Sequence, residues 1–226
     1  MRIGRPPHNW VITPRQAIAV QNKLSAAISR QGRPRNPGLA AGLDAAFTPD
    51  KKRCIGGVVL WNIHDHTIVE RHTAILELRF PYIPGLLSFR ETPALIAALR
   101  KLRNIPDLII CDGQGVAHPR RLGIASHIGL IADLPTIGCA KSRLIGDYRE
   151  PDPQQGASSP LRHNNELIGA VLRTRDNVKP VFVSVGHNIE LDIAVRIILD
   201  CAIRYRLPEP TRLADRLVAE RKKDFA

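Results

Sequence analysis

The apolar run Leu108-Ile109-Ile110-Cys111, followed at once by Asp112 and Gly113, limits the fold of this chain more than any other feature. A strand with apolar side chains on both faces is buried on both faces, as in parallel and mixed sheets that helices cover. A second buried strand is predicted over residues 136–140, and apolar residues at helical spacing predict a helix over residues 122–132 between them. This alternation of buried strands and helices is typical of an α/β protein.

Three further strand-like stretches precede this run, over residues 39–47, 55–61 and 66–78, and turn-rich segments separate them. Strands joined by short turns predict an antiparallel meander. Two later stretches, over residues 167–174 and 181–185, predict a hairpin. Together with the buried strands, these segments predict an α/β fold with a mixed sheet flanked by helices.

The spacing of apolar residues predicts the other helices. Thr13 and Pro14 fit a capping residue followed by proline at the first helical position, so we expect an N-terminal helix over about residues 14–30. A second helix is expected around residues 95–102, and a last long helix over residues 189–205.

Two further segments are rich in polar or basic residues. Residues 147–165 contain several prolines and polar side chains, which indicates a loop or a flap, and residues from about 216 to 226 are expected to form a basic C-terminal tail. The length of 226 residues fits one domain over residues 1–226.

The charge of the chain favours a polyanionic partner. It has 33 Lys and Arg residues against 21 Asp and Glu, a formal net charge of +12, while 44% of its residues are hydrophobic. A folded protein with this excess of positive charge is typical of nucleic-acid binding, and a role of the basic surface in solubility alone is the alternative.

The sequence also predicts where the chain resides. It contains neither the apolar core of a signal peptide nor an apolar run long enough to cross a membrane, so we expect a soluble, cytoplasmic protein without membrane contact. Its four cysteines are far apart and form no CxxC pair, which indicates reduced thiols rather than a zinc site or disulfides.

Three acidic residues and one lysine are the candidates for chemistry. Asp44 lies in an otherwise apolar or small-residue segment, where a carboxylate needs a cation or hydrogen-bond donors, although a turn-capping role is equally consistent. Asp112 follows a buried strand, at the edge of a sheet where ligands gather. Lys141 follows the next buried strand, and it is either an active-site cation or a solvated side chain.

Glu91 has two local interpretations. Ser88 and Glu91 match a capping box at a helix start, whereas Thr92-Pro93 offers a later start that would leave Glu91 free to point at a metal. Acids carried by separate elements suit Mg²⁺, which takes oxygen ligands from a few carboxylates, waters and a substrate phosphate. One or two such ions would serve a phosphodiesterase.

Several long motifs resemble the endonuclease V family, and the resemblance extends from the N-terminal helix to Arg212. The motifs are Pro81-Tyr82-Ile83-Pro84-Gly85-Leu86-Leu87-Ser88-Phe89-Arg90-Glu91, the segment from Asp112-Gly113-Gln114-Gly115 to His127, Pro135 to Leu144, Val183 to His187, and Arg206 to Arg212. The resemblance implies a ribonuclease H-like fold, with which the predicted order of elements is compatible.

The resemblance also implies a metal-dependent DNA repair nuclease. Asp44, Glu91 and Asp112 are implied as the metal-binding acids, Mg²⁺ as the cofactor with Mn²⁺ as a substitute, and Lys141 as an active-site lysine. Asp215 is a further catalytic candidate, but some relatives have a histidine at this position, so its role stays open.

The implied substrate is DNA that contains deoxyinosine, duplex or single-stranded. The implied cut is at the second phosphodiester bond on the 3′ side of the lesion, and it leaves a 3′ hydroxyl and a 5′ phosphate. An inosine-specific endoribonuclease and a catalytically silent nucleic-acid-binding protein are the alternatives. A monomer is expected, and Arg33, Arg35 and the basic C-terminal residues are candidates for backbone contacts.

The lesion itself requires a wedge and a pocket. The resemblance makes Pro81-Tyr82-Ile83-Pro84 the wedge, and an aromatic ring between two stiff prolines suits stacking on bases, although a buried tyrosine in a turn is the structural alternative. Flipping costs least where pairing is already poor. The residues expected to surround the flipped base are Gly85, Leu87, Gly113, His118, Gly123 and Ile124, and His118 either reads the base or braces its loop.

Overall fold

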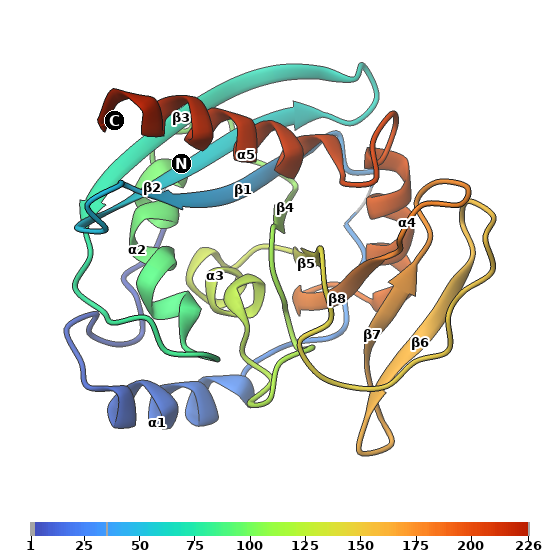
Figure 1. Ribbon diagram of the computed structural model, residues 1–226, viewed down its shortest axis with the longest axis horizontal. Coiled ribbons are helices and arrows are strands. Elements are labelled where there is room, and N and C mark those ends of the chain that lie inside the picture. Colours follow the sequence, from blue (N-terminus) through green and yellow to red (C-terminus); the bar gives the residue numbers. More distant parts are fainter. Residues whose placement is uncertain (1–2, 35, 226) are drawn as a thin grey trace.

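An eight-stranded mixed sheet forms the centre of the protein in the computed structural model, which describes residues 3–34 and 36–225 (Figure 1). The strands are β1 (Leu39–Phe47), β2 (Arg53–Asn62), β3 (Thr67–Glu77), β4 (Leu108–Cys111), β5 (Thr136–Ala140), β6 (Ser158–His163), β7 (Glu166–Leu172) and β8 (Val181–His187). The helices are α1 (Pro14–Ser25), α2 (Leu87–Leu99), α3 (Ile124–Ala132), α4 (Leu191–Cys201) and α5 (Glu209–Lys222), followed by the short 3₁₀ helix η1 (Lys223–Phe225).

The strand order is β3-β2-β1-β4-β5-β8-β7-β6. The neighbours β1, β4 and β5 are parallel, whereas the other pairs are antiparallel. The predicted meander, the buried strands and the hairpin are therefore confirmed. Because Asp112 and Lys141 directly follow β4 and β5, they lie at the carboxyl edge of the parallel strands, where ligands gather.

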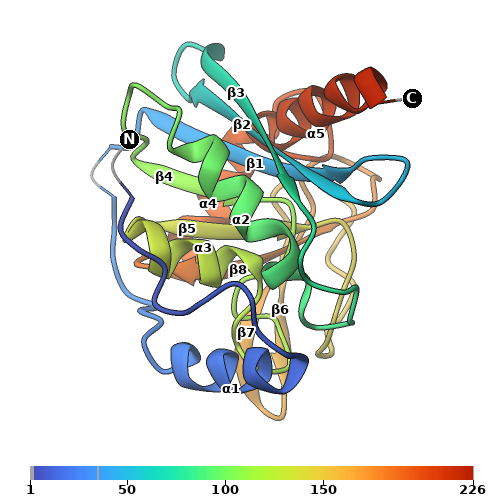
Figure 2. The same ribbon diagram turned by 90° about the vertical axis from the view of Figure 1, so that its left-hand side faces the viewer.

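The two faces of β1 have different partners because successive side chains of a strand point to opposite sides. Ala41 and Leu43 belong to the apolar core beneath α2 and α3. Gly42 and Asp44 point to the other side, where Gly42 meets the backbone of Pro210 in α5. Figure 2 shows α2 and α3 on one side of the sheet and α5 on the other. Asp44 thus faces α5.

The basic C-terminal tail predicted over about residues 216–226 begins within a helix, because residues 209–222 form α5. Pro208 is the N-terminal cap of α5 and Pro210 lies in its first turn, where proline is common. Ala214 and Val218, one turn apart, lie on the buried side of the helix. The basic residues at positions 216, 221 and 222 lie on the exposed side. After Pro210, the fully buried apolar side chains of this helix are Ala214 and Val218, so its charged residues dominated the sequence pattern.

The predicted ends of two other helices are also wrong. Helix α1 ends at Ser25, not near residue 30, because the following segment runs beside the end of β8: the carbonyl oxygens of Ser29 and Gly32 accept hydrogen bonds from the backbones of Asn188 and Glu190. Helix α4 ends at Cys201, where the next residue leaves helical geometry, instead of continuing to residue 205.

The segment 147–165 is not a loop throughout. Its last part forms β6, the edge strand that pairs with β7, and Asp147 forms an isolated bridge to Arg162. An edge strand with exposed polar residues lacks the apolar pattern of an interior strand. Arg33 pairs with Glu190 at 2.6 Å, and Arg35 lies outside the described residues.

Two further expectations concern thiols and membranes. All four cysteines are buried and free, as predicted. Among the described residues, no helix has the length and apolar character required to cross a membrane.

The contact between β1 and α5 generates a stability prediction. A Cβ at Gly42 would overlap the Pro210 backbone, so Gly42→Ala should lower the free energy of unfolding by about 1–3 kcal/mol or more. Gly38→Ala is the matched control, because its Cβ would meet nothing closer than 3.8 Å. Urea denaturation measures both; equal stability of the two variants would show that α5 does not pack on β1 in this way.

Candidate active site

Asp44 is a half-buried carboxylate with few compensating donors. Its Oδ1 accepts a hydrogen bond from the backbone of Ala45 at 2.8 Å, and its carboxyl group shares a further hydrogen bond with Asp215 of α5. Burial and the negative charge of Asp112 raise the pKa of Asp44 to about 8. A proton or a cation is therefore required to stabilise this group at neutral pH.

Asp112 and Lys141 form the ion pair of the site. The Lys141 Nζ lies 2.6 Å from Asp112 Oδ2 and 4.0 Å from Asp215 Oδ2. Burial works against the charge of Lys141, but the hydrogen bond and charge of Asp112 outweigh it and raise the lysine pKa. Arg206 donates to the Lys141 carbonyl oxygen at 2.5 Å, which holds this residue at the end of β5.

Glu91 is neither part of a capping box with Ser88 nor outside a helix that begins at Thr92-Pro93, the two alternatives that the sequence allowed. Helix α2 begins at Leu87 without a side-chain cap, so Ser88 and Glu91 are both inside the helix and Pro93 follows within it. Burial and the charge of Asp112 raise the pKa of Glu91 to about 8, although Arg90 opposes this shift. Glu91 thus belongs electrostatically to the same site as Asp112.

The acidic set has the chemistry of a site for a hard divalent cation. Its donors are carboxylate oxygens, and a cation near Asp44, Glu91 and Asp112 would offset the repulsion that raises the pKa of Asp44 and Glu91. Within residues 3–34 and 36–225, no three acidic, histidine or cysteine side chains meet as a ready-made metal cluster. The donor set fits Mg²⁺ by its chemistry rather than by a closed geometry.

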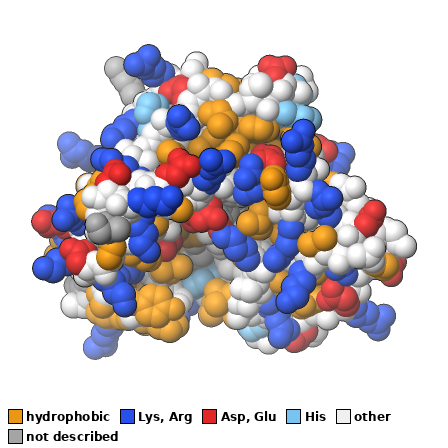
Figure 3. Space-filling model, turned by 45° about the horizontal axis from the view of Figure 1, so that its top comes forward, with side chains coloured by type: hydrophobic (Ala, Val, Ile, Leu, Met, Phe, Trp, Pro, Cys, Tyr) orange, Lys and Arg blue, Asp and Glu red, His pale blue; other side chains and the backbone are white. Residues whose placement is uncertain are grey.

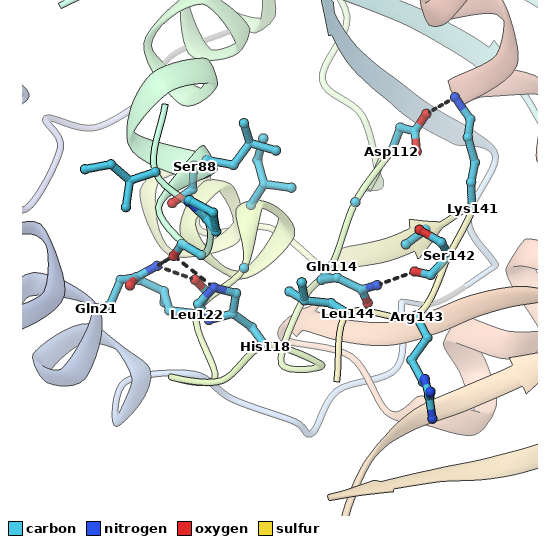
Figure 4. Close-up of a pocket in the computed structure, with 18 of the residues that line it drawn as sticks. Gln21, Ser88, Asp112, Gln114, His118, Leu122, Lys141, Ser142, Arg143 and Leu144 are labelled. Atoms are coloured by element: carbon cyan, nitrogen blue, oxygen red, sulfur yellow. Dashed lines mark hydrogen bonds and ion pairs between the residues drawn. The ribbon is translucent and has the colours of Figure 1, made fainter. Parts of the chain in front are cut away.

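A cavity of about 420 Å³ lies beside the acidic set (Figure 4). Its volume lies in the range of small-ligand pockets. Nine of the ten residues predicted to contact the lesion line it, whereas Pro81 does not: they are Tyr82, Ile83, Pro84, Gly85, Leu87, Gly113, His118, Gly123 and Ile124. Asp112 and Lys141 also line it, so the cavity and the acidic set are continuous.

The loop that carries Tyr82 is held through the Gly85 carbonyl oxygen. That oxygen accepts hydrogen bonds from Gln21 Nε2 at 3.0 Å, His118 Nε2 at 3.0 Å and Arg120 at 2.8 Å, and Gly85 has a φ of +77° that favours glycine. His118 therefore braces the loop, which favours that alternative over base reading. Burial and nearby Arg120 lower the pKa of His118 to about 4, so the ring is neutral.

Sequence reasoning missed several residues of the cavity, among them Gln21, Ser88, Gln114 and Arg143. Gln21 was detectable, because it lies one turn after buried Ala17 and so occupies the inner face of α1. Ser88 carried a signal too, but it was interpreted as a helix cap. Nothing in the local pattern marked the segment after Lys141 as part of the cavity.

The outer surface near the site carries both signs of charge. Figure 3 shows Lys and Arg side chains spread over this face, with acidic side chains among them around a central hollow. A basic surface around an acidic site attracts a polyanion and leaves the carboxylates free to hold cations.

The chain is similar to known proteins over nearly its full length. The Endonuclease V family model matches residues 22–216. Endonuclease V of Trichormus variabilis is 48% identical over 216 residues, which cover 95% of this chain and 98% of that protein. The range matched by the family model includes every site residue that the sequence predicted.

Solved structures agree with this result. Endonuclease V from Streptomyces avermitilis has a TM-score of 0.91 at 41% identity, with 99% of each chain covered. Endonuclease V from Ciona intestinalis, in complex with a 24mer DNA containing an inosine followed by a ribo-adenosine, has a TM-score of 0.82 at 25% identity, with 94% of this chain and 98% of that chain covered. The expected ribonuclease H-like fold is thereby confirmed.

The raised pKa of Asp44 generates a pH prediction for stability without metal. Between the ordinary aspartate pKa and about 8, the folded protein keeps a proton that the unfolded chain releases, so stability falls as the pH rises through this window. Asp44→Asn cannot ionise. From pH 5 to pH 9 in EDTA, the wild type should lose roughly 4 kcal/mol more unfolding free energy than this variant.

Denaturant titrations at each pH measure the difference. Asp200→Asn, at an exposed aspartate of α4, controls for the change in net charge and should follow the wild type. Parallel pH profiles of wild type and Asp44→Asn would contradict the raised pKa.

Proposed function

The chain belongs to the endonuclease V family of nucleases, and from that premise we propose that it is a DNA repair endonuclease that recognises deoxyinosine. It would flip the hypoxanthine base into the cavity and hydrolyse the second phosphodiester bond on the 3′ side. The products would carry a 3′ hydroxyl and a 5′ phosphate. We further propose that it acts in the cytoplasm, as a monomer.

The continuity of the cavity with the acidic set carries this proposal. Asp112 and Lys141 belong to both, so a base held in the cavity would place a nearby backbone phosphate at the carboxylates. A cavity of about 420 Å³ has room for one purine base. Recognition and hydrolysis at neighbouring positions explain why the cut would lie at a fixed distance from the lesion.

The cavity wall supports recognition of a base carbonyl. Leu87 and Ser88 come from the first turn of α2, and Ile124 from the first turn of α3. First-turn N–H groups lack partners within a helix, and no side chain of the described residues caps either helix. The N–H groups of Phe89 and Ala125 already donate to the carbonyl oxygens of Leu86 and Gln114, which leaves those of Leu87, Ser88 and Ile124 as the donors at the cavity. Two helix starts facing one cavity offer donors to the O6 of hypoxanthine, where adenine has an amino group.

The rim supports the wedge proposal. The Tyr82 side chain is 70% exposed, next to Ile83 and Pro84 at the cavity. An exposed aromatic ring at the rim of the cavity would stack on the bases left by the flipped nucleotide. The deeply buried tyrosine that the sequence also allowed is excluded by this exposure.

Asp44, Glu91 and Asp112 would hold the metal, Mg²⁺ or Mn²⁺ in its place. When bound, the metal would polarise the phosphate and acidify an attacking water. The Asp44 carboxyl, protonated at neutral pH without a cation, would release its proton as the site fills. Lys141 keeps its charge beside Asp112 and would neutralise the phosphate oxygens.

Asp215 would have a supporting role where some relatives have histidine. Its carboxyl group bonds to Asp44 and lies 4.0 Å from Lys141 Nζ, and it is 53% exposed. At this position it would hold a proton shared with Asp44 and orient the lysine.

An inosine-specific endoribonuclease is the second candidate. The Ciona intestinalis protein binds DNA in which a ribo-adenosine follows the inosine, so a ribonucleotide is accepted there at that position in that protein. Matched DNA, RNA and DNA strands with one ribonucleotide after the inosine would separate the two substrates. Faster cutting of RNA than of DNA would favour the ribonuclease.

The proposed function is tested by incubating the protein and Mg²⁺ with end-labelled DNA that contains one deoxyinosine. We expect one nick at the second bond, no nick in the same strand with deoxyadenosine, and none in EDTA. Asp112→Asn should lower cleavage at least about a hundredfold while binding persists, because it keeps the shape but removes a metal-binding charge. Near-normal nicking by this variant would remove Asp112 from the catalytic set.

Tyr82→Ala tests the wedge. It should slow the cleavage of duplex deoxyinosine DNA by roughly tenfold or more, since one stacked base contributes about 1–3 kcal/mol, but it should affect the single strand less because that base is already unpaired. Ile105→Ala is the control, since Ile105 is 66% exposed before the amino end of β4, away from the site. Equal losses on both substrates would make Tyr82 a general strand contact.

A further inference from the structure

A chain of hydrogen bonds links the N-terminal segment to the cavity through two histidines. The His8 Nε2 lies 2.7 Å from His127 Nε2, and His127 Nδ1 lies 3.2 Å from the Ser88 Oγ. Ser88 lines the cavity, from the second residue of α2. These contacts use both ring nitrogens of His127.

The contact between His8 and Asn9 determines which atom donates in each of these hydrogen bonds. The His8 Nδ1 lies 2.6 Å from the backbone carbonyl oxygen of Asn9, which can only accept, so Nδ1 must carry the proton. In a neutral ring the Nε2 of His8 is then an acceptor. It follows that His127 Nε2 donates to His8, that His127 Nδ1 accepts, and that the Ser88 hydroxyl donates to His127.

This assignment requires both rings to be neutral, and burial favours the neutral form of each. His127 is completely buried and packs against His8, Trp10 and Phe89. Burial lowers the pKa of His127 to about 3 and also lowers the pKa of His8. A charged His127 would donate hydrogen bonds from both nitrogens, and the Ser88 hydroxyl could then no longer donate to it. Burial disfavours this charged form.

We propose that Ser88 reads the N1 position of the flipped base as an obligate hydrogen-bond acceptor, and that His127 and His8 are positioning residues that hold it in this state. The hydroxyl proton of Ser88 is engaged by His127, so only its lone pairs can face the cavity. Hypoxanthine carries a hydrogen on N1, whereas the N1 of adenine is an acceptor. This inference rests on the proposed function and adds a second criterion to recognition of O6.

Recognition at O6 and recognition at N1 both reject adenine, because adenine has the opposite hydrogen-bonding group at each position. The first turns of α2 and α3 supply donors where hypoxanthine has O6 and adenine has an amino group. Ser88 supplies an acceptor where hypoxanthine has a donor and adenine has a lone pair. A buried acceptor that faces another acceptor is left without a partner, which is more costly than the loss of one contact.

The first test needs no substrate. In protein labelled with ¹⁵N-histidine, the nitrogen shifts distinguish the two neutral tautomers, and variants at His8 and His127 assign the signals. We expect a proton on Nδ1 of His8 and on Nε2 of His127 between pH 6 and pH 8. A proton on Nδ1 of His127 would overturn the proposal, because Ser88 could then donate into the cavity.

The second test compares single strands that contain deoxyinosine or 2′-deoxynebularine, whose purine lacks both the N1 hydrogen and O6. Single-turnover cleavage gives the ratio of kcat/KM for the two strands. Ser88→Ala should lower this ratio about tenfold, as expected for one buried hydrogen bond, mainly by slowing cleavage of deoxyinosine. Ser126→Ala, a buried serine next to His127 that does not line the cavity, should keep the wild-type ratio.

Variants of His8 test the proton chain itself. His8→Phe removes the acceptor for His127 and should lower the ratio, whereas His8→Gln offers a carbonyl oxygen in its place and should restore it. An unchanged ratio in folded Ser88→Ala would overturn the reading of N1, and an unchanged ratio in folded His8→Phe would overturn the role of the chain. If the wild type fails to cut the deoxyinosine strand, the proposed function fails instead.

Discussion

The crowding of several half-buried carboxylates at one edge of the sheet is the constraint on which the rest of the structure depends. Burial and the charge of Asp112 raise the pKa of both Asp44 and Glu91. Three parallel strands and two helices from distant parts of the chain are required to hold these groups together. The site therefore stores electrostatic repulsion that a proton, Lys141 or a cation can relieve, and the packed sheet opposes this repulsion.

Close backbone contacts at this edge of the sheet bring the acidic residues and the cavity together. A Cβ at Gly115 would overlap the Val185 backbone, and one at Gly138 would overlap the backbone of Gly115. A Cβ at Gly123 would overlap the Gln114 backbone, which brings the start of α3 against the segment after β4. Side chains at these three glycine positions would push the starts of the helices away from the carboxylates. The glycines therefore keep the cavity that holds the base close to the carboxylates.

Sequence patterns predicted the interior strands because their apolar runs report burial directly, as in β4 and β5. They failed where tertiary contacts decide. Helix α5 packs on the sheet through Pro210, Ala214 and Val218 amid many charged residues, and the edge strand β6 has no apolar pattern. Most candidate cavity residues were named through family motifs, and the structure brings nine of ten around one cavity. Ser88 was misinterpreted as a cap because its true partner, His127, lies 39 residues away.

The Ser88 example indicates why specificity is harder to infer from sequence than catalysis. A carboxylate at a strand end has a limited set of uses, and its charge identifies it in any context. A hydroxyl can donate or accept, and its role is decided by partners that only the fold supplies. Here the decisive partner is a backbone carbonyl at Asn9, three groups removed from the cavity. A sequence motif can therefore identify the carboxylates that carry out the chemistry. Which base they act on depends on whether the Ser88 hydroxyl in the cavity wall donates or accepts a hydrogen bond.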